Sequence, residues 1–389
     1  MFNKSLVVVA FLLAIAFDAP ALPAQAAPPE IQPVLLQMIR DDAVHRELNL
    51  SEDQVRQVFA ALEPIDGPWF RVRIRPAQER IETIDRLSEQ LANALAEILD
   101  SKQLERLDQL QNQALGTRMI VRDKTATALG LSSTTRQSLY EVFAKTDSVV
   151  AGVQQQSQAQ SLDAAAAKKI DKAKADEKKA LVDALTNQQK RTLSSLTGPA
   201  FNFAAVNRMY PAAPELTSEG ASWLQGDPLT LDGLKGKVVA VHFYAFQCIN
   251  CRRNLPHYNR WHTDYADEGL VVIGIQTPET AAERSADRVA AALQTEQIQY
   301  PVLMDAQSAN WKQWSNTMWP TVYLVDKKGF LRRWWQGEMN WKGTPGEAQM
   351  RETIERLLAE ERGDRETRRG GDTETRREQR NGTGGQENG

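Results

Sequence analysis

The chain holds two cysteines, and both lie in the stretch FQCINCRRNLP, which runs from Phe246 to Pro256. Cys248 and Cys251 are two residues apart, a spacing that allows a dithiol to close a small disulfide. Three interpretations fit such a pair: a redox-active dithiol, part of a metal site, or two inert buried thiols. A framework of structural disulfides is excluded, because it would need several bridges.

The residues around the pair indicate where the two thiols lie. An apolar run that predicts a buried strand begins at Val238, and an amphipathic pattern that predicts a helix follows the cysteines. We therefore expect Cys248 at the N-terminal end of a helix, where free backbone N–H groups and the helix dipole favour the thiolate. Arg252 and Arg253 are expected to strengthen this effect. Cys251 lies one turn deeper, so Cys248 is the expected nucleophile and Cys251 the resolving thiol.

A metal site has few candidate ligands in this part of the chain. Zinc needs four ligands, or three and a water molecule. His242, His257 and His262 are near the cysteines in sequence, but no histidine follows His262 and there is no second cysteine pair. The sequence therefore predicts redox chemistry without a metal and without a cofactor, and it places His257 and His262 on the surface of the helix.

Strands alternate with helices in the C-terminal part of the chain, which predicts an α/β domain over residues 213–361. The last helix is expected to start with Thr344 as N-cap, Pro345 at its first position and Glu347 completing a capping box. The other expected elements are strands over 238–243, 270–275, 301–304, 321–325 and 331–335, and helices over 249–266 and 281–294.

Residues 27–198 are rich in Gln, Ala, Leu and charged residues and poor in Gly and Pro, which predicts an all-helical domain. The sequence LNLS at Leu48 recurs as LGLS at Leu129, and this predicts two internal repeats of about eighty residues, each a helical hairpin. The stretches LSEDQ, LDSKQ and LTNQQ resemble the LTxxQ repeats of small periplasmic stress and chaperone proteins. Capping positions mark four helix starts: Ser51, Asp100, Ser132 and Thr186, with Gln54, Gln103 and Gln189 three residues after three of them. A structural domain without chemistry is the alternative.

The two ends of the chain differ from both domains. Residues 1–26 combine an early lysine, an apolar run and the small-residue pattern Ala24-Gln25-Ala26, which predicts a signal peptide and a periplasmic or cell-envelope location. An uncleaved anchor is the alternative, but the apolar run is shorter than the roughly 18 to 20 residues that span a bilayer. Residues 362–389 predict a disordered charged tail, and residues 199–212 predict a linker. The net charge of -3 argues against nucleic acid as a partner.

Residues 228–340 resemble the TlpA-type branch of the thioredoxin superfamily, and most closely the soluble domain carried by DipZ-type proteins. The resemblance rests on the Cys-Ile-Asn-Cys sequence followed by Leu255-Pro256, on GIQTPE from Gly274, and on Trp319-Pro320. It implies a four- or five-stranded sheet flanked by helices, and the exchange of dithiol for disulfide with exported partner proteins. The predicted fold is thus multidomain: an all-α helical-repeat domain followed by an α/β thioredoxin-like domain.

The resemblance also implies roles for single residues. Pro256 would kink the active-site helix, and Pro320 would be a cis-proline that binds substrate together with Trp319. A trans proline that opens an edge strand is the alternative for Pro320. His242 stands where thioredoxins usually carry a buried acid, so it is either a proton relay or a strand histidine bonded to a backbone carbonyl. Glu279 is the other proton-relay candidate, or else a solvated loop charge.

Together these features predict an exported thiol-disulfide oxidoreductase. Its expected partners are exported proteins with thiols or disulfides and an upstream thiol-disulfide electron donor or acceptor. The alternatives are a thioredoxin-like scaffold or chaperone-type binding protein, and a peroxiredoxin-like peroxidase, although peroxiredoxins carry threonine where this chain has Ala245. The helical domain would hold an unfolded client, which a long connector over 199–226 brings to the cysteines, or it is only a spacer.

Overall fold

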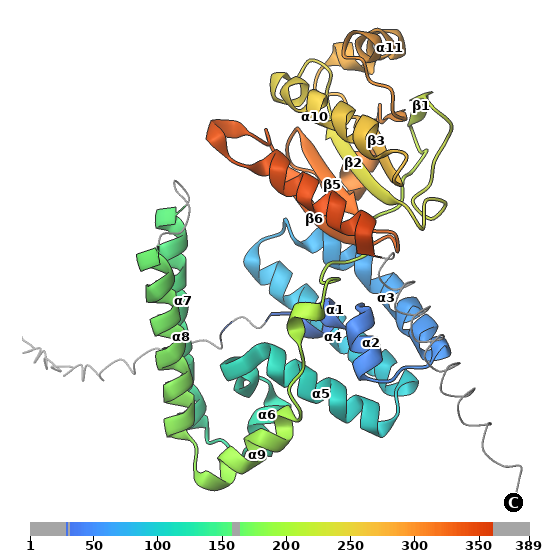
Figure 1. Cartoon of the computed structure of the whole chain (residues 1–389). Helices are drawn as coiled ribbons and strands as arrows, with labels where there is room; N and C mark the ends of the chain where they lie inside the picture. Colours follow the sequence, from blue (N-terminus) through green and yellow to red (C-terminus); the bar gives the residue numbers. More distant parts are fainter. Residues whose placement is uncertain (1–28, 30–31, 158–163, 361–389) are drawn as a thin grey trace, which may run out of the picture. The chain divides into compact units, whose positions relative to one another are not determined.

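The computed structural model describes residue 29, residues 32–157 and residues 164–360 (Figure 1). The predicted signal peptide and the predicted charged tail lie outside the described residues. Contacts group the described chain into two compact units, 116–195 in one and 32–115 with 196–360 in the other. The first half of the helical region thus belongs to the same unit as the C-terminal α/β domain, whereas the sequence placed a boundary after residue 198. The predicted domain boundaries stay a prediction.

A six-stranded mixed sheet organises the C-terminal part of the chain. Its strands β2, β3 and β4 run parallel, and β1, β5 and β6 run antiparallel to their neighbours. The spatial order is β1-β4-β3-β2-β5-β6, with β1 over Ser222–Gln225, β2 over Val238–Tyr244, β3 over Leu270–Gln276, β4 over Val302–Met304, β5 over Thr321–Val325 and β6 over Leu331–Gln336. The predicted fold class, helices followed by a thioredoxin-like α/β domain, is confirmed.

The five predicted strands agree with the structure to within one residue at either end. Strand β1 was not predicted, because it is short and lies in a segment that the prolines and glycines marked as irregular connector. It pairs with β4 at the edge of the sheet, and it brings the strand number above the four or five that the resemblance implied.

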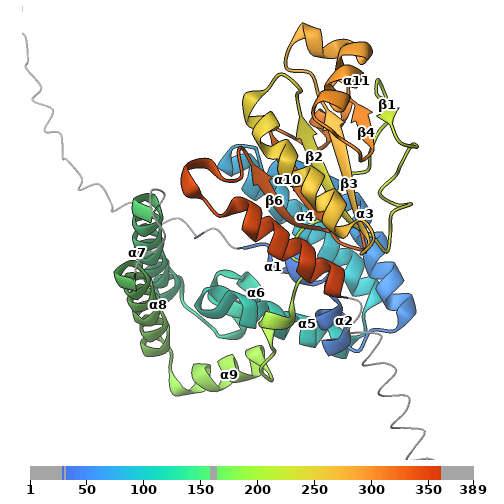
Figure 2. The same ribbon diagram turned by 45° about the horizontal axis from the view of Figure 1, so that its top comes forward.

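Three helices cover one face of the sheet: α10 (Ile249–Tyr265), α11 (Ala286–Thr295) and the last helix, 346–360. Figures 1 and 2 show α10 and the red last helix side by side over this face. The predicted helix over 281–294 is interrupted. A short 3₁₀ helix, η3 (Ala281–Arg284), comes first, and the Ser285 side chain then caps α11 by accepting from the Arg288 N–H.

The predicted start of the last helix is wrong in its capping residue. The Thr344 hydroxyl donates to the carbonyls of Met339 and Trp341, so it does not cap the helix. Asn340 Oδ1 accepts from the Glu347 N–H at 3.2 Å instead, and Glu347 Oε1 accepts from Trp261 Nε1 at 2.9 Å. An asparagine from the preceding loop therefore replaces the threonine of the expected capping box.

The other face of the sheet is covered by α12 (Ala309–Gln313), by the residues after it and by α3 (Glu52–Val72). Phe70 of α3 is 3% exposed and belongs to the hydrophobic cluster of this face. Its ring packs edge-on against Trp314 at 6.3 Å and against Tyr323 at 6.1 Å between centroids. A helix of the N-terminal region therefore supplies part of the layer that buries the sheet.

The helices before residue 116 form a second core in the same unit. They are α1 (Val34–Met38), α2 (Asp42–Glu47), α3, α4 (Ala77–Ile98) and α5 (Ser101–Leu115). The predicted caps are confirmed: Ser51 and Gln54 form a reciprocal capping box, and Asp100 and Gln103 exchange the same two bonds. Gln54 Nε2 also donates to Gln103 Oε1 at 2.7 Å, which ties the two helix starts together.

The other unit repeats this order of a short helix, a long pair and a short helix. Its elements are the 3₁₀ helix η1 (Gly116–Val121), α6 (Asp123–Ala128), α7 (Ser133–Ser157), α8 (Ala164–Ala184) and α9 (Asn187–Thr197). The predicted caps at Ser132 and Thr186 are confirmed by bonds from the backbone N–H groups of Thr135 and Gln189. The internal duplication itself stays a prediction. No helix in the described ranges is long and apolar enough to cross a membrane.

The predicted linker over 199–212 is held in place. The Arg208 guanidinium pairs with Asp42 at 2.9 Å and with Asp326 at 3.0 Å. Asp42 belongs to helix α2 of the first helical segment, and Asp326 follows strand β5 of the α/β domain. Ala212 forms a β-bridge with Phe330. The connector therefore fixes the first helical segment to the α/β domain, whereas the sequence suggested only that a long connector over 199–226 lets the two halves approach each other.

Replacing Phe70 tests whether α3 is part of this fold. We expect Phe70→Ala to lower the free energy of unfolding of the compact unit by about 3 to 5 kcal/mol, since a buried ring is lost and a cavity remains. Ile74→Ala is the control, because Ile74 lies four residues after Phe70 and is 45% exposed. This replacement should lower the free energy of unfolding by less than about 0.5 kcal/mol. Urea unfolding followed by tryptophan fluorescence measures both, and equal stability of the two variants would contradict the docking of α3.

Candidate active site

Strand β2 and helix α10 together place the two cysteines. Cys248 is the N-cap residue of α10, and its own N–H donates to the carbonyl of Ala245, just after β2, at 3.1 Å. Cys248 is half-buried, whereas Cys251, in the first turn of α10, is fully buried. Both are free thiols. The expected placement at a strand-to-helix turn, with one accessible and one protected sulfur, is confirmed.

The two thiols have opposite acidities. A hydrogen bond from the Cys251 thiol, helped by the backbone N–H groups of Cys251 and Asn250, lowers the pKa of Cys248 to about 7, although burial and the Glu279 carboxylate oppose the shift. Burial raises the pKa of Cys251 well above its ordinary value, and the bond that it donates to Cys248 raises it further. Near neutral pH, Cys248 is therefore partly thiolate and Cys251 is a thiol, as nucleophile and resolving thiol require.

The arginines after the pair have other partners. Arg252 Nε lies 2.7 Å from Glu296, and Arg253 Nη1 lies 3.1 Å from Glu338. Each guanidinium is thus neutralised by a carboxylate of another segment. The pKa of Cys248 is lowered by hydrogen bonds from Cys251 and Asn250 at the start of α10. The two arginines are not among the causes of this shift, although the sequence predicted that they would strengthen it.

The peptide bond between Trp319 and Pro320 is cis, as predicted. Strand β5 pairs with β2 so that Thr321 lies opposite Phe243, and the residues before Thr321 therefore run on beside the turn that leads to Cys248. The Trp319 ring stacks on Trp311 with centroids 4.0 Å apart. The substrate-binding role of Trp319 and Pro320 stays a prediction.

His242 is fully buried in β2 behind the cysteines. Its ring stacks on Tyr258 with centroids 4.2 Å apart, and neither ring nitrogen has a hydrogen-bond partner among the described residues. The alternative interpretation of His242, a ring bonded to a backbone carbonyl, is therefore not observed among the described residues. Burial lowers the pKa of His242 to about 3, so the ring is neutral at physiological pH. A relay through His242 would have to use the neutral ring, and that role stays a prediction.

Glu279 is exposed, and its charge raises the pKa of both cysteines, so it lies within electrostatic reach of them. The sequence reasoning missed its neighbour Glu283, which is fully buried. Glu283 Oε1 accepts from the Gln247 N–H, and Oε2 accepts from the N–H groups of Glu279 and Thr280, each at 2.8 Å. This carboxylate ties the residue before Cys248 to the Glu279 turn. The pattern Thr280-x-x-Glu283, a capping box, was the signal that could have found it.

The remaining histidines of α10, His257 and His262, are half-buried, whereas the sequence placed them on the surface. In residues 29, 32–157 and 164–360, no three His, Cys, Asp or Glu side chains come together in a way that could hold a metal ion. The absence of a metal from the function stays a prediction.

The alkylation rate of Cys248 tests the hydrogen bond between the thiols. Only the thiolate reacts with iodoacetamide, so the rate should rise with pH and reach half its maximum near pH 7. Cys251→Ala removes the main donor, and we expect it to move the midpoint upward. Cys248→Ser is the control and should lose the rapid phase. A midpoint near the ordinary cysteine pKa of about 8.5 in the unaltered chain would contradict this account.

Comparisons with known proteins agree with this geometry. Residues 211–334 match the AhpC/TSA family. Protein DipZ of Mycobacterium tuberculosis is 35% identical over 177 residues, which are 45% of this chain and 24% of DipZ. Thiol-disulfide oxidoreductase YkuV of Bacillus subtilis is 28% identical over 148 residues, 38% of this chain and 94% of YkuV.

Among solved structures, the solution structure of a thioredoxin-like protein in the oxidized form is 28% identical, with a TM-score of 0.34, and covers 38% of this chain and 95% of that one. The chain spans about a quarter of the length of DipZ, 24%. The family match covers the part of the chain in which the cysteines lie. Residues 211–334 are a thioredoxin-fold domain of the TlpA/DipZ type, and this type of domain is a thiol-disulfide oxidoreductase.

Proposed function

We propose that the whole chain is an exported thiol-disulfide oxidoreductase that acts on envelope proteins through Cys248-Ile249-Asn250-Cys251. The observation that carries the proposal is the placement of the two free thiols: Cys248 is half-buried at the N-terminus of α10, and Cys251 is fully buried one turn later. The lowered pKa of Cys248, about 7, agrees with this placement. A half-buried thiolate beside a buried thiol is suited to attack a disulfide and then to be resolved.

Each step of the exchange has a group that performs it. The Cys248 thiolate attacks one sulfur of a partner disulfide, a mixed disulfide forms, and the other partner sulfur leaves as a thiolate. Cys251 then gives its proton to the partner thiolate that has left and attacks the Cys248 sulfur, and the second partner sulfur leaves as a thiolate that takes a proton from water. The partner gains two electrons, and Cys248 and Cys251 become a disulfide. The same steps in reverse oxidise a partner dithiol.

The surface around Cys248 suits an extended segment of a protein partner. Ile249, next to the nucleophile, is 57% exposed, and Met318, next to Trp319, is 45% exposed. These two exposed side chains, one beside the nucleophile and one beside Trp319, can make apolar contacts with a partner segment. We propose that Trp319 and Pro320 line the segment that carries the target disulfide, with their backbone beside it.

Peroxidase activity is the second candidate, because the matched family is named AhpC/TSA. Against it stands Ala245, in the position where peroxiredoxins carry threonine. A scaffold or a chaperone-type binding protein is the third candidate. It would need neither thiol, so the lowered pKa of Cys248 argues against it. Rapid consumption of hydrogen peroxide by the purified chain would favour the peroxidase.

The reduction of insulin tests the proposed chemistry. With dithiothreitol as reductant, the full chain should accelerate insulin precipitation, and Cys248→Ser should abolish the acceleration because no nucleophile remains. Cys251→Ser leaves the mixed disulfide unresolved, so in cells it should hold partner proteins covalently on Cys248. Equal rates for the unaltered chain and Cys248→Ser would contradict the proposal. The trapped proteins, identified by mass spectrometry, name the substrates.

Export is tested by the N-terminus of the protein found in the cell envelope. We expect processing after Ala26, so the first residue of that protein should be Ala27. Ala26→Asp alters the small-residue site and should leave unprocessed chain. A processed protein in the unaltered strain that is recovered only from the cytoplasm would contradict export, and an unprocessed chain in the membrane fraction would establish the anchor instead.

A further inference from the structure

The C-terminal end of α3 contacts the loop that leads to the cis-proline. Arg73, the residue after α3, is half-buried, and its guanidinium reaches residues more than 240 positions away in the sequence. Arg73 Nη2 donates to the carbonyls of Trp314 at 2.6 Å and Ser315 at 3.1 Å, and to the Tyr323 hydroxyl at 3.0 Å. One side chain therefore joins the start of this loop to strand β5.

The contacted loop has a backbone that needs support. Ser315 has a positive φ of 48°, a conformation that side-chain-bearing residues seldom adopt. Its carbonyl is one of the two that Arg73 binds. The Tyr323 hydroxyl, which accepts from Arg73, donates in turn to Asn316 Oδ1 at 2.8 Å. The guanidinium thus fixes residues 314–316 both directly and through Tyr323.

These residues are continuous with the proposed substrate-binding pair. Residues 314–316 lead within a few positions to Trp319 and Pro320. The Trp319 ring rests on Trp311, and the Thr321 hydroxyl donates to the Met318 carbonyl at 2.8 Å. The loop is therefore held at its start by Arg73 and at its end by β5, and a change at its start would move Trp319.

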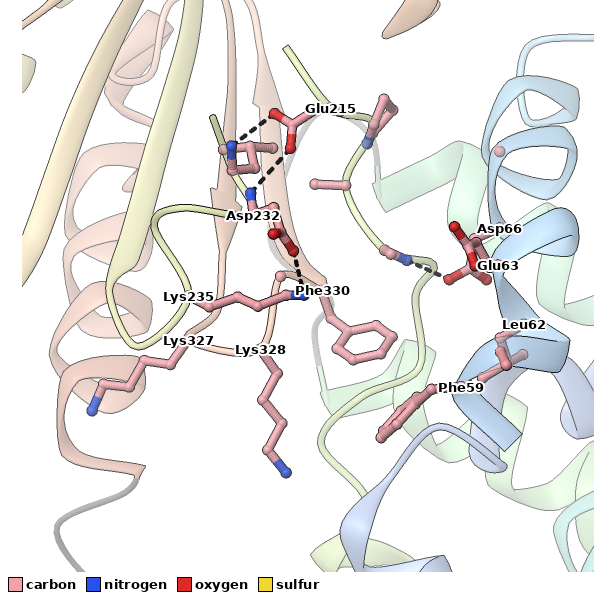
Figure 3. A pocket seen from close by; sticks show the side chains of 17 residues that line it. Phe59, Leu62, Glu63, Asp66, Glu215, Asp232, Lys235, Lys327, Lys328 and Phe330 are labelled. Carbon is pink, nitrogen blue, oxygen red and sulfur yellow. Dashed lines mark hydrogen bonds and ion pairs between the residues drawn. The ribbon is translucent and has the colours of Figure 1, made fainter. Parts of the chain in front are cut away.

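The middle of the interface between α3 and the α/β domain combines direct contacts with a pocket. The Phe59 and Phe330 rings pack with centroids 5.8 Å apart, and both residues line a pocket of about 780 Å³ that Figure 3 shows. Asp66 Oδ2 accepts from the Ala212 N–H at 2.9 Å, which the figure marks with a dashed line. The contacts of Phe70 and Arg73 at the end of α3 add to these, and they are the ones that reach residues 314–316.

We infer that Arg73 is a positioning residue for disulfide exchange, with Phe70 as its apolar support. The guanidinium lies over the Phe70 ring at 3.6 Å from the centroid, and it fixes the loop that presents Trp319 and Pro320 to a protein substrate. The inference rests on the proposed function. The first helical segment would thus act on the substrate site indirectly, by holding the loop that leads to Trp319 and Pro320.

The test compares Arg73→Met with Arg71→Met in the full chain. Arg71 lies two residues away on α3 and is exposed, so its replacement is a matched control. Arg73→Met should raise KM for insulin about tenfold, which corresponds to about 1.4 kcal/mol of lost binding, with little change in kcat. Arg73→Lys should recover part of the loss, since an ammonium group still donates to a carbonyl. The pH midpoint of Cys248 alkylation should not move, because that shift arises within α10.

Two results would overturn the inference while the proposed function stands. One is an Arg73→Met variant that reduces insulin with the KM of the unaltered chain. The other is an equal loss of rate with a small disulfide such as hydroxyethyl disulfide, which would indicate general damage to the domain. If Arg73→Met does not fold, as judged by tryptophan fluorescence, Arg73→Gln replaces it in both comparisons, and a KM for insulin equal to that of the unaltered chain overturns the inference. Failure of the unaltered chain to reduce insulin would instead refute the proposed function.

Discussion

The placement of Cys248 at the N-terminus of α10, next to the buried Cys251 thiol, is the constraint on which the site depends. A half-buried thiolate is costly unless donors surround it. Here the Cys251 thiol and the N–H groups of Asn250 and Cys251 supply those donors, and they are available because α10 begins at Cys248. This geometry requires β2 to end where it does. Strand β2 is held in place because it pairs with β3 on one side and with β5 on the other, and every one of its residues is buried.

Much of this arrangement could be predicted, because it is written in local patterns. Strand β5 was predicted at its observed bounds, Thr321–Val325, since five apolar and β-branched residues lie between a proline and a charged turn. The helix start at Cys248 followed from the change of period after β2. The caps at Ser51 and Asp100 followed from residue types three positions apart.

The failures are of two kinds. In some places a nearby residue took the role that was predicted for another. Thr344 was the expected cap of the last helix, but its hydroxyl donates to the Met339 carbonyl, and Asn340 Oδ1 accepts from the Glu347 N–H instead. Arg252 was close to Cys248 in sequence, yet Glu296 binds it from a distant segment. The larger omission was the docking of α3, because a contact between Phe70 and Trp314 leaves no periodic trace in either segment. Amphipathic spacing indicates that a face is buried, but not against what.

The docking also distinguishes the two halves of the helical region. In the register that aligns Leu48 with Leu129, Phe70 aligns with Ala151 and Arg73 with Gln154. A methyl group cannot fill the space that the Phe70 ring fills, and a glutamine carries no charged fork for two carbonyls and a hydroxyl. The predicted repeat therefore does not extend to these two residues. Capped helix starts occur in both halves, at Ser51 and Asp100 and at Ser132 and Thr186. The residues at the end of α3 occur only in the first half, and their contacts explain why that half belongs to the same compact unit as the redox domain.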